Sequence, residues 1–469
     1  MNFKKLNTLI GWTVFAIATS VYLMTMESTA SLWDCGEYIT AAYKLEVGHP
    51  PGAPLFMVLG RLFSFFAAPD SVALWINALS AVSSSLTILF MFWSMSLLLK
   101  KLVQTQKGEL GKSDGIMVLV ASGVAALAYT FSDSFWFSAV EGEVYAMASL
   151  FTAVIFWAAL KWDEEMNLVE NHNASPNRWI LIIFFMLGLA VGVHLLGILV
   201  VPAIGYLIYF NVSKKITWVW FILTGVISVF ALGFIQEGII PGSIALASSF
   251  EVSFVNSFGL PFFSGFIFFF VLLAAILAYA IHYANKKGIY FLKLGVWSMI
   301  FMLLGYTTYI TTMIRSNADP SVDMYNVDNP VTLVGYLGRE QYGDWPILFG
   351  PDYVDKVDNV ESGDQYVKAP TNYELAGKSY KRDWSSAPSS HLFPRMWDGE
   401  NDRGQMDSYK AFAGVVDGEA PTLRDNIKYF TNYQFGFMYL RYFLWNFAGK
   451  QNDLQGFGNV RDGNFSTGI

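Results

Sequence analysis

Nine apolar segments, each long enough or nearly long enough to cross a lipid bilayer, constrain this chain more than any other feature. They lie at roughly residues 9–26, 72–99, 116–131, 144–160, 179–193, 195–210, 216–234, 261–282 and 289–313. A hydrocarbon core about 30 Å thick needs about 20 apolar residues in a helix. Hydrophobic residues make up 54% of the 469-residue chain and charged residues only 14%, which excludes a soluble domain of this length. We therefore predict an all-α polytopic membrane protein with about nine transmembrane helices.

The lysines and arginines between these segments predict how the chain crosses the membrane. Lys4 and Lys5 precede the first segment, which we interpret as an uncleaved signal anchor with a cytoplasmic amino terminus. The even-numbered connections then lie in the cytoplasm, where basic residues concentrate in membrane proteins. These connections hold Lys100, Lys101, Lys107, Lys112, Lys161, Arg178, Lys214, Lys215, Lys286 and Lys287.

The composition changes near Arg315, because the last third of the chain holds more than half of its charged residues. We predict a transmembrane catalytic domain at 1–314, with a first outer loop at 27–71, and an extracytoplasmic module at 315–469 that continues in a longer protein. Residues 350–424 read as a loop-dominated part of this module. The aromatic-rich segment 426–450 is apolar enough to lie against the membrane. The net charge of -7 gives no reason to expect nucleic acid binding.

The outer connections, which include 132–143, the turn at 192–194 and 236–260, place on one side of the membrane the ionisable residues Asp34, Glu37, Lys44, Glu46, His49, Arg61, Asp133, Glu141, Glu143, His194, Glu237, Glu251 and Arg315. The helix interiors are nearly free of charge, whereas an ion pathway or proton relay needs acids and bases inside the spans. This pattern argues against a transporter. Within the first outer loop, residues 53–67 are apolar but too short to span comfortably, which predicts an interfacial helix.

Asp34 and Glu37 stand in the first outer loop, in the stretch Ser31-Leu-Trp-Asp-Cys-Gly-Glu-Tyr38. Their spacing of three residues places both carboxylates on one face of a short helix, where one can accept a proton and the other can orient it. The same residues could instead only cap or solvate an interfacial helix. Their position at the membrane edge favours the catalytic interpretation.

Four motifs carry a resemblance to a known family: Trp33-Asp-Cys-Gly-Glu-Tyr38, His49-Pro-Pro-Gly52, Val140-Glu-Gly-Glu-Val-Tyr145 and Tyr336-Leu-Gly-Arg-Glu-Gln-Tyr-Gly343. With the layout of spans and loops, the chain resembles the GT-C superfamily of membrane glycosyltransferases. It is most similar to a bacterial branch related to a vertebrate endoplasmic-reticulum protein O-mannosyltransferase. The resemblance implies a GT-C-like fold, a polyprenyl-phosphate sugar as donor substrate and no required cofactor. Some superfamily members use a divalent cation, which we do not favour here.

The resemblance also implies roles for individual residues. Asp34 corresponds to the first-loop acid that acts as general base, and Glu37 would orient Asp34 or the acceptor. A cation near the bilayer surface should neutralise the leaving phosphate. The candidates for that cation are Arg61, His194 and Arg315.

The other candidate substrate-binding residues are Glu141, Glu143 and His49. The two glutamates could contact the sugar, hold a cation or only favour a helix start electrostatically. His49, in its proline-rich turn, could shape the active site or only form a rigid turn. His194 could be structural, and Arg315 could be an interface anchor.

These inferences predict an inverting transferase that moves a hexose, expected to be mannose, to Ser or Thr hydroxyls of exported proteins. A second hypothesis keeps the donor but sends the sugar to a lipid or cell-envelope polysaccharide. A third, of another class, is a non-catalytic membrane scaffold or transporter. The expected location is the bacterial inner membrane, with the active site and the carboxy-terminal module in the periplasm. Lipid-linked sugar, an exported acceptor protein and membrane lipid are the expected partners.

Overall fold

The computed structural model describes residues 2–167, 176–213, 215–353, 355–399 and 403–448. The chain divides into two compact units, Met1–Arg339 and Glu340–Ile469. The boundary between the two units therefore lies after the short helix at residues 330–337, which follows the last apolar segment. The expected assignment of catalysis to 1–314 stays a prediction, and Gly463–Ile469 lies outside the described residues.

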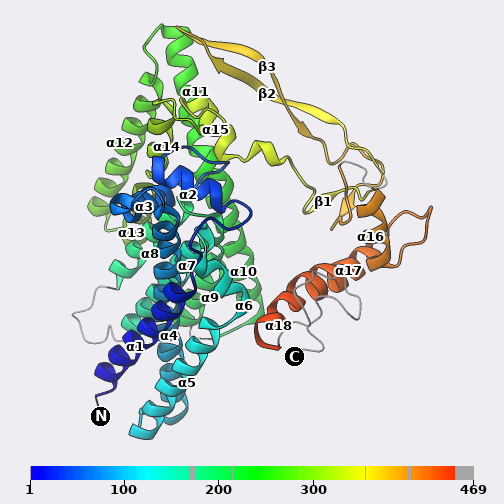
Figure 1. The fold of residues 1–469 in the computed structure, drawn as a ribbon. Coiled ribbons are helices and arrows are strands. Elements are labelled where there is room, and N and C mark those ends of the chain that lie inside the picture. Colours follow the sequence, from blue (N-terminus) through cyan, green and yellow to red (C-terminus); the bar gives the residue numbers. More distant parts are fainter. Residues whose placement is uncertain (1, 168–175, 214, 354, 400–402, 449–469) are drawn as a thin grey trace. The chain divides into compact units, whose positions relative to one another are not determined.

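The first unit is a bundle of apolar helices (Figure 1). Among the described residues, eight helical stretches are long and apolar enough to cross a membrane, so the chain is an integral membrane protein. They are α1 (Phe3–Thr25), α4 (Val72–Lys107), α5 (Lys112–Thr130), α7 (Val144–Met166), η3 with α9 (Leu195–Val212), α10 to α11 (Trp218–Phe258), α12 (Ser264–Lys287) and α13 with α14 (Tyr290–Ser316). The segment expected at 179–193 is α8 (Asn177–Val191), whose 15 residues extend for only about 22 Å.

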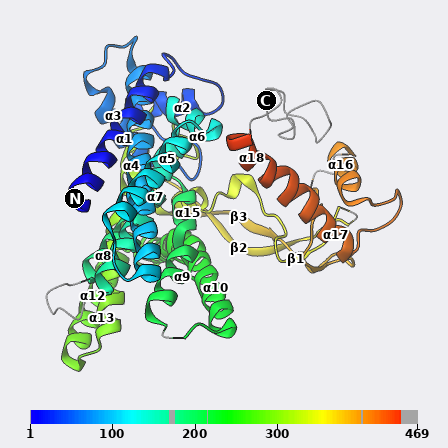
Figure 2. The same cartoon turned by 90° about the horizontal axis from the view of Figure 1, so that it is seen from below.

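Close backbone approach explains how α8 fits between its neighbours α7 and α13, which Figure 2 shows from below. A Cβ atom on Gly188 would lie 2.1 Å from the backbone oxygen of Met302 in α13. A Cβ atom on Gly305 would lie 2.6 Å from the backbone oxygen of Phe185 in α8. Small residues at such crossings let membrane helices pack backbone against backbone.

The helix from Trp218 to Phe258 corrects one expectation, because the sequence suggested a connection at 236–260. The described helix continues from α10 (Trp218–Gly233) through the π-helix η4 (Phe234–Ile239) into α11 (Ile240–Phe258). A wider π turn beside a proline is a common way to continue such a helix, and Pro241 follows η4 here.

The acid Glu251 lies in the otherwise apolar helix α11, and its hydrogen bonds explain its presence there. Its carboxylate is fully buried and accepts hydrogen bonds from the backbone N–H groups of Phe263, Gly265 and Phe266 at 2.5, 3.0 and 3.1 Å. These groups belong to the first turn of α12, whose backbone N–H groups lack intrahelical partners. Glu251 therefore caps α12 and ties it to α11.

Short elements lie between the spans on the side that holds the acidic motifs. They are α2 (Cys35–Lys44), α3 (Pro54–Phe63) with η1 (Ser64–Phe66), α6 (Asp133–Val140) and α15 (Pro330–Leu337). The helix expected within 53–67 is thus present. Asn329 caps α15, since its side-chain oxygen accepts the N–H groups of Val331 and Thr332 at 2.9 and 3.2 Å.

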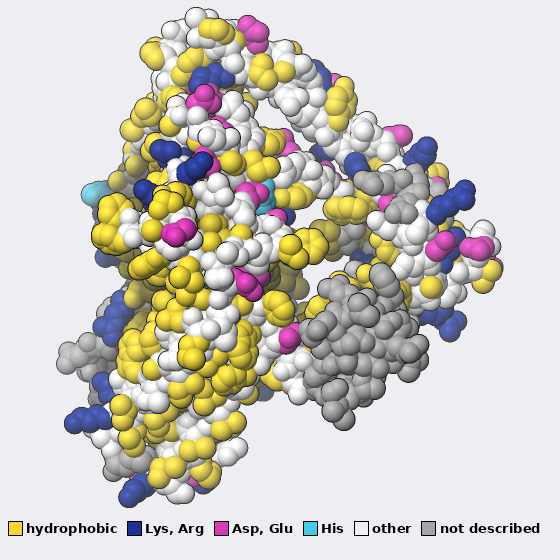
Figure 3. Space-filling model, in the orientation of Figure 1, with side chains coloured by type: hydrophobic (Ala, Val, Ile, Leu, Met, Phe, Trp, Pro, Cys, Tyr) yellow, Lys and Arg dark blue, Asp and Glu magenta, His cyan; other side chains and the backbone are white. Residues whose placement is uncertain are grey.

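Charged side chains gather at the other end of this unit, while apolar side chains cover a broad band of its helices (Figure 3). Lys100 of α4 pairs with Glu164 of α7 at 2.9 Å. Asp163 of α7 accepts a 2.7 Å hydrogen bond from Asn211 of α9 and pairs with Lys101. These contacts tie three spans together where basic residues were expected in the cytoplasm; Lys214 lies outside the described residues.

The second unit contains more regular structure than the expected loop-dominated module. Strands β2 (Asn359–Lys368) and β3 (Tyr373–Arg382) form an antiparallel hairpin, and β1 (Phe349–Gly350) pairs with β4 (His391–Leu392). Because most β2 and β3 side chains are exposed or half-buried, the hairpin has no alternation of apolar and polar residues for a sequence reading to detect. The helices are η5 (Glu340–Tyr342), α16 (Arg403–Ala413), α17 (Leu423–Tyr429), the π-helix η6 (Phe430–Leu440) and α18 (Arg441–Ala448).

Asp352 holds the strands of this unit to its helices. The buried carboxylate lies 2.9 Å from Nε2 of His391 and accepts hydrogen bonds from the backbone N–H of Arg395 at 2.8 Å and from Asn426 at 3.3 Å. Burial alone would lower the pKa of His391, but hydrogen bonds to the Leu392 carbonyl and to Asp352 raise it above its ordinary value. Burial raises the pKa of Asp352, and the contact between the two side chains is structural.

Candidate active site

The site begins at the turn that leads into α2. Trp33 has a left-handed backbone and a 94% exposed side chain, and the chain turns there from the first span. Asp34 follows at the amino-terminal end of α2, where its side chain is exposed and makes no capping hydrogen bond. An exposed carboxylate at this position is accessible to a substrate hydroxyl.

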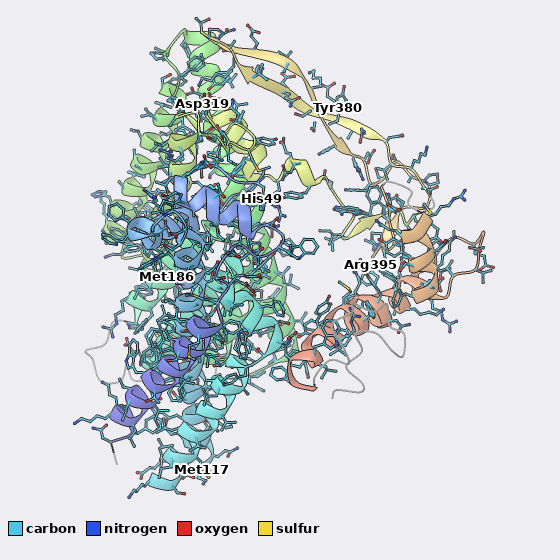
Figure 4. All side chains as sticks on the ribbon, viewed as in Figure 1. His49, Met117, Met186, Asp319, Tyr380 and Arg395 are labelled. Carbon is cyan, nitrogen blue, oxygen red and sulfur yellow. The ribbon has the colours of Figure 1, made fainter. Side chains whose placement is uncertain are left out.

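Glu37 is paired with His49 rather than with Asp34. Its Oε1 atom accepts a hydrogen bond from the backbone N–H of His49 at 2.7 Å and lies 2.9 Å from the His49 Nδ1 atom. Burial alone would raise the pKa of Glu37, but the contacts with His49 lower it below its ordinary value. The hydrogen bond to Glu37 raises the pKa of His49. Figure 4 labels this histidine.

The turn that carries His49 is held from three directions. The Tyr336 hydroxyl of α15 donates to the Gly48 carbonyl at 2.7 Å. The backbone N–H of Val47 donates to the Val322 carbonyl at 3.0 Å, and the N–H of Leu55 donates to the Gly192 carbonyl at 2.8 Å.

Two glycines of this turn are required by close contacts. A Cβ atom on Gly48 would lie 2.6 Å from Oε1 of Glu37. Gly52 has a left-handed φ of 71°, and its Cβ atom would lie 2.2 Å from the Tyr336 hydroxyl. The motifs His49-Pro-Pro-Gly52 and Tyr336 to Gly343 are therefore linked, because Tyr336 fits only against glycine.

Glu141 and Glu143 come from the segment between α6 and α7. Glu141 accepts a 2.8 Å hydrogen bond from the Ser31 hydroxyl, and the backbone N–H of Glu27 donates to the Val140 carbonyl at 2.9 Å. These contacts bring the segment against the loop that contains Asp34. The sequence order of the motifs gives no sign of this pairing.

Glu143 is the more buried of the two glutamates, with 7% of its surface exposed. Burial, together with the charges of Glu141 and Asp34, raises the pKa of Glu143 to about 7. Cys35 lies in the same region, and burial raises the pKa of its thiol to about 11, so the thiol is uncharged at neutral pH. The site therefore combines an exposed acid with a partly protonated one.

His194 lies at the same end of the unit, with its ring 5.3 Å from that of Tyr145. Its Nδ1 atom accepts the backbone N–H of Leu196 at 3.1 Å, so the proton of the neutral ring is on Nε2. Burial, with the charges of Arg339 and His49, lowers the pKa of His194. A neutral histidine is a poor counter-ion for phosphate.

The two predicted arginines have structural contacts elsewhere. The Arg61 guanidinium lies 5.0 Å from the centre of the Tyr43 ring. The Arg315 Nε atom donates to the Leu45 carbonyl at 2.6 Å, and Nη2 lies 3.4 Å from the Lys44 carbonyl. Arg315 therefore binds the carboxy-terminal end of α2, where the helix dipole favours a cation.

Arg339 is a basic residue of this region that the sequence interpretation did not single out. It is exposed, has a left-handed φ of 56° directly after α15, and its charge acts on both His49 and His194. The only sequence signal was its place in the Tyr336 to Gly343 motif. Among the described residues, no group of three or more His, Cys, Asp or Glu side chains is arranged to hold a metal ion.

Comparisons with known proteins bear on the part of the chain that holds most of this site. A family model described as the N-terminal domain of protein O-mannosyl-transferase TMEM260 matches residues 34–217, beginning at Asp34. The amino-terminal part of the chain is similar to protein O-mannosyl-transferases. The match includes every predicted site residue except Arg315. A second model, described as a family of unknown function (DUF8416), matches residues 343–431.

Two curated relatives show the same similarity. The chain is 28% identical over 168 residues to protein O-mannosyl-transferase tmem260 of Dictyostelium discoideum, covering 35% of the chain and 18% of the relative. It is 28% identical over 151 residues to protein O-mannosyl-transferase TMEM260 of Mus musculus, covering 32% of the chain and 19% of the relative. The chain thus spans less than a fifth of the length of the relatives it matches. No solved structure matches it.

Proposed function

We propose that this chain transfers a hexose, mannose by similarity, from a polyprenyl phosphate to Ser or Thr hydroxyls of exported proteins. The observation that carries the proposal is the position of Asp34. It is an exposed carboxylate whose charge acts on Glu143, and it lies within the residues matched by the TMEM260 family model. The basic residues at the opposite end of the spans support an extracytoplasmic site, and the proposed location is the periplasmic side of a bacterial inner membrane.

The proposed reaction is a direct displacement without a metal or cofactor. The acceptor oxygen attacks the anomeric carbon of the sugar while Asp34 takes the hydroxyl proton. The bond between the anomeric carbon and the phosphate oxygen breaks, and polyprenyl phosphate leaves with the electron pair. This single displacement inverts the anomeric centre. A positioned base contributes a factor of about 10² to 10⁴ to such a step.

The leaving phosphate needs a cation, and Arg339 is the favoured residue. Its charge acts on both His49 and His194, whereas the Arg315 guanidinium binds the end of α2. Guanidinium groups suit phosphate because they form two parallel hydrogen bonds. The Glu37–His49 pair would then position the turn beside the sugar.

An apolar cavity supports a lipid-linked donor. It has a volume of about 520 Å³ and lies among α11, α12, α13, α14 and α15, lined by residues such as Ala278, Ile310 and Leu333. A smaller cavity of about 170 Å³ lies on another side of α14 and is lined by Gly48 and Tyr336. An isoprenoid chain in the larger cavity would approach the His49 turn along α14 and α15.

The test is sugar transfer by purified protein in liposomes, using polyprenyl-phosphate mannose and exported proteins of the host. We expect Asp34→Asn to lower turnover by about 10² to 10⁴ without changing thermal stability. Asp70→Asn, at an exposed carboxylate of the same outer loop, is the matched control and should keep full activity. An active Asp34→Asn variant would refute the assignment of the base.

The other outcomes separate the alternative functions. Donor binding without transfer to any protein, but with transfer to lipid or envelope polysaccharide, would favour the glycan acceptor. Absence of donor binding by the wild-type chain would favour a non-catalytic scaffold.

A further inference from the structure

The last described helix of the second unit carries an exposed apolar residue at almost every fourth position. The series runs through α17, η6 and α18 and comprises Leu423, Ile427, Thr431, Phe435, Tyr439, Phe443 and Phe447. The six members other than Thr431 have between 48% and 58% of their surface exposed. The Thr431 hydroxyl donates to the Ile427 carbonyl at 3.0 Å, so its proton is used within the helix. We call these seven residues the apolar stripe.

The π-helix explains why the apolar stripe is straight. A four-residue repeat advances about 40° per step around an α-helix of 3.6 residues per turn, so it would wind around the helix. The π-helix η6 (Phe430–Leu440) has more residues per turn, so a four-residue step rotates around its axis in the opposite direction and offsets the rotation in the α-helical parts. The rings accordingly stack along the axis: Phe435 and Tyr439 lie 5.8 Å apart with an interplanar angle of 22°, and Tyr439 and Phe443 lie 6.3 Å apart at 15°.

The opposite face of the same helix packs into the unit. Tyr429 stacks on Tyr433 at 4.9 Å, and Tyr433 lies 4.6 Å from the Phe412 ring of α16. The buried Arg441 places its guanidinium 3.5 Å from the Phe437 ring. These contacts fix the rotation of the helix about its axis. The apolar stripe is therefore exposed because the opposite face is packed, and not because the helix frays.

We propose that the apolar stripe lies in the interfacial layer of the membrane and anchors the second unit on the bilayer surface. The chain is an integral membrane protein whose last span ends at Ser316, and the second unit begins at Glu340, so the second unit is covalently tethered to the membrane part of the chain. Aromatic side chains favour the headgroup region, and amphipathic helices bury such faces there.

A lipid surface fits the apolar stripe better than a protein partner does. Its Thr431 hydroxyl is already used within the helix, so the Tyr439 hydroxyl is its one remaining side-chain polar group. Protein interfaces carry about one hydrogen bond per 100 to 200 Å², which a face of this composition could not supply. Acyl chains can surround the stacked rings without a matching shape.

The experiment uses the full chain in liposomes and a fluorescent label on a single introduced thiol. Cys35 is the only native cysteine and is buried, so the wild-type chain serves as the labelling blank. Phe443→Cys places the label in the apolar stripe. Val416→Cys, 62% exposed in the loop before α17, is the matched control, and Tyr439→Cys guards against a local effect of one substitution.

We expect nitroxide-bearing lipids to quench the label at 443 and 439 several-fold more than at 416, and iodide in the water to show the reverse order. Equal iodide quenching at 443 and 416 would overturn the proposal, because the stripe would face water. Protection at 443 from both quenchers would also overturn it, because protein, either a second copy or chain beyond residue 448, would then cover the stripe.

Discussion

Glu143 is the residue whose surroundings alter its chemistry most usefully. Burial and the charges of Glu141 and Asp34 raise its pKa to about 7, so its charge changes near physiological pH. Below this pKa the neutral carboxyl can donate a hydrogen bond to a sugar hydroxyl, and above it the carboxylate repels a lipid phosphate. The folded state also holds a proton that the unfolded chain loses near pH 4.5, so the contribution of Glu143 to stability falls as the pH rises from 4.5 to about 7.

We therefore predict that KM for the polyprenyl-phosphate donor rises by up to about tenfold as the pH increases through about 7. Glu143→Gln should remove this rise, because the amide stays neutral at both ends of the range. The measurement is KM as a function of pH for wild type, Glu143→Gln and the control Asp70→Asn. If Glu143→Gln keeps the inflection, another group is responsible and the assignment is wrong.

Some site residues could be proposed from sequence and others could not. Asp34, Glu37, Glu141 and Glu143 stand out because carboxylates are rare beside long apolar segments. Their partners come from distant parts of the chain, so no local pattern pairs Glu37 with His49 or Ser31 with Glu141. For the same reason, Arg339 could not be preferred over Arg315 before the contacts of Arg315 with the end of α2 were known.

At the scale of elements, the spans are the most predictable feature, since length and hydropathy decide them locally. The exceptions have tertiary causes. The helix from Trp218 to Phe258 continues through a stretch that reads as a connection, and its buried Glu251 caps α12 from another helix. The strands β2 and β3 escape detection because most of their side chains are exposed or half-buried.

The crossing of α8 and α13 gives a prediction at this scale. Gly188→Ala should lower the apparent Tm in detergent, because the new Cβ atom would meet the Met302 backbone oxygen at 2.1 Å. Overpacking of this kind costs about 1–3 kcal/mol. Gly123→Ala in α5, where no atom lies within 4 Å of the new Cβ, is the matched control and should keep or slightly raise the Tm. Equal Tm values for the two variants would show that the crossing relaxes easily.

For the whole molecule, composition and charge placement suffice to predict an integral membrane protein with its acidic motifs on one side of the membrane. They do not predict the apolar cavity, because a cavity depends on how α11 to α15 pack. Residues of α14 and α15 line both this apolar cavity and the smaller cavity beside the His49 turn. If the proposed function is correct, the length of the apolar cavity should determine which chain lengths of polyprenyl-phosphate donor the protein uses.

We predict that Ala278→Phe lowers transfer from a long-chain polyprenyl-phosphate donor by more than about tenfold while leaving transfer from a short-chain donor nearly unchanged. Ala278 lines the cavity from α12, so a larger side chain should exclude the distal isoprenoid units without reaching Asp34. Ala275→Phe, an exposed position of the same helix outside the cavity lining, is the matched control for the change in volume. The measurement is initial rate against chain length for the three proteins. An equal loss with both donors would indicate a general disturbance of α12, and no loss with either would place the lipid chain outside this cavity.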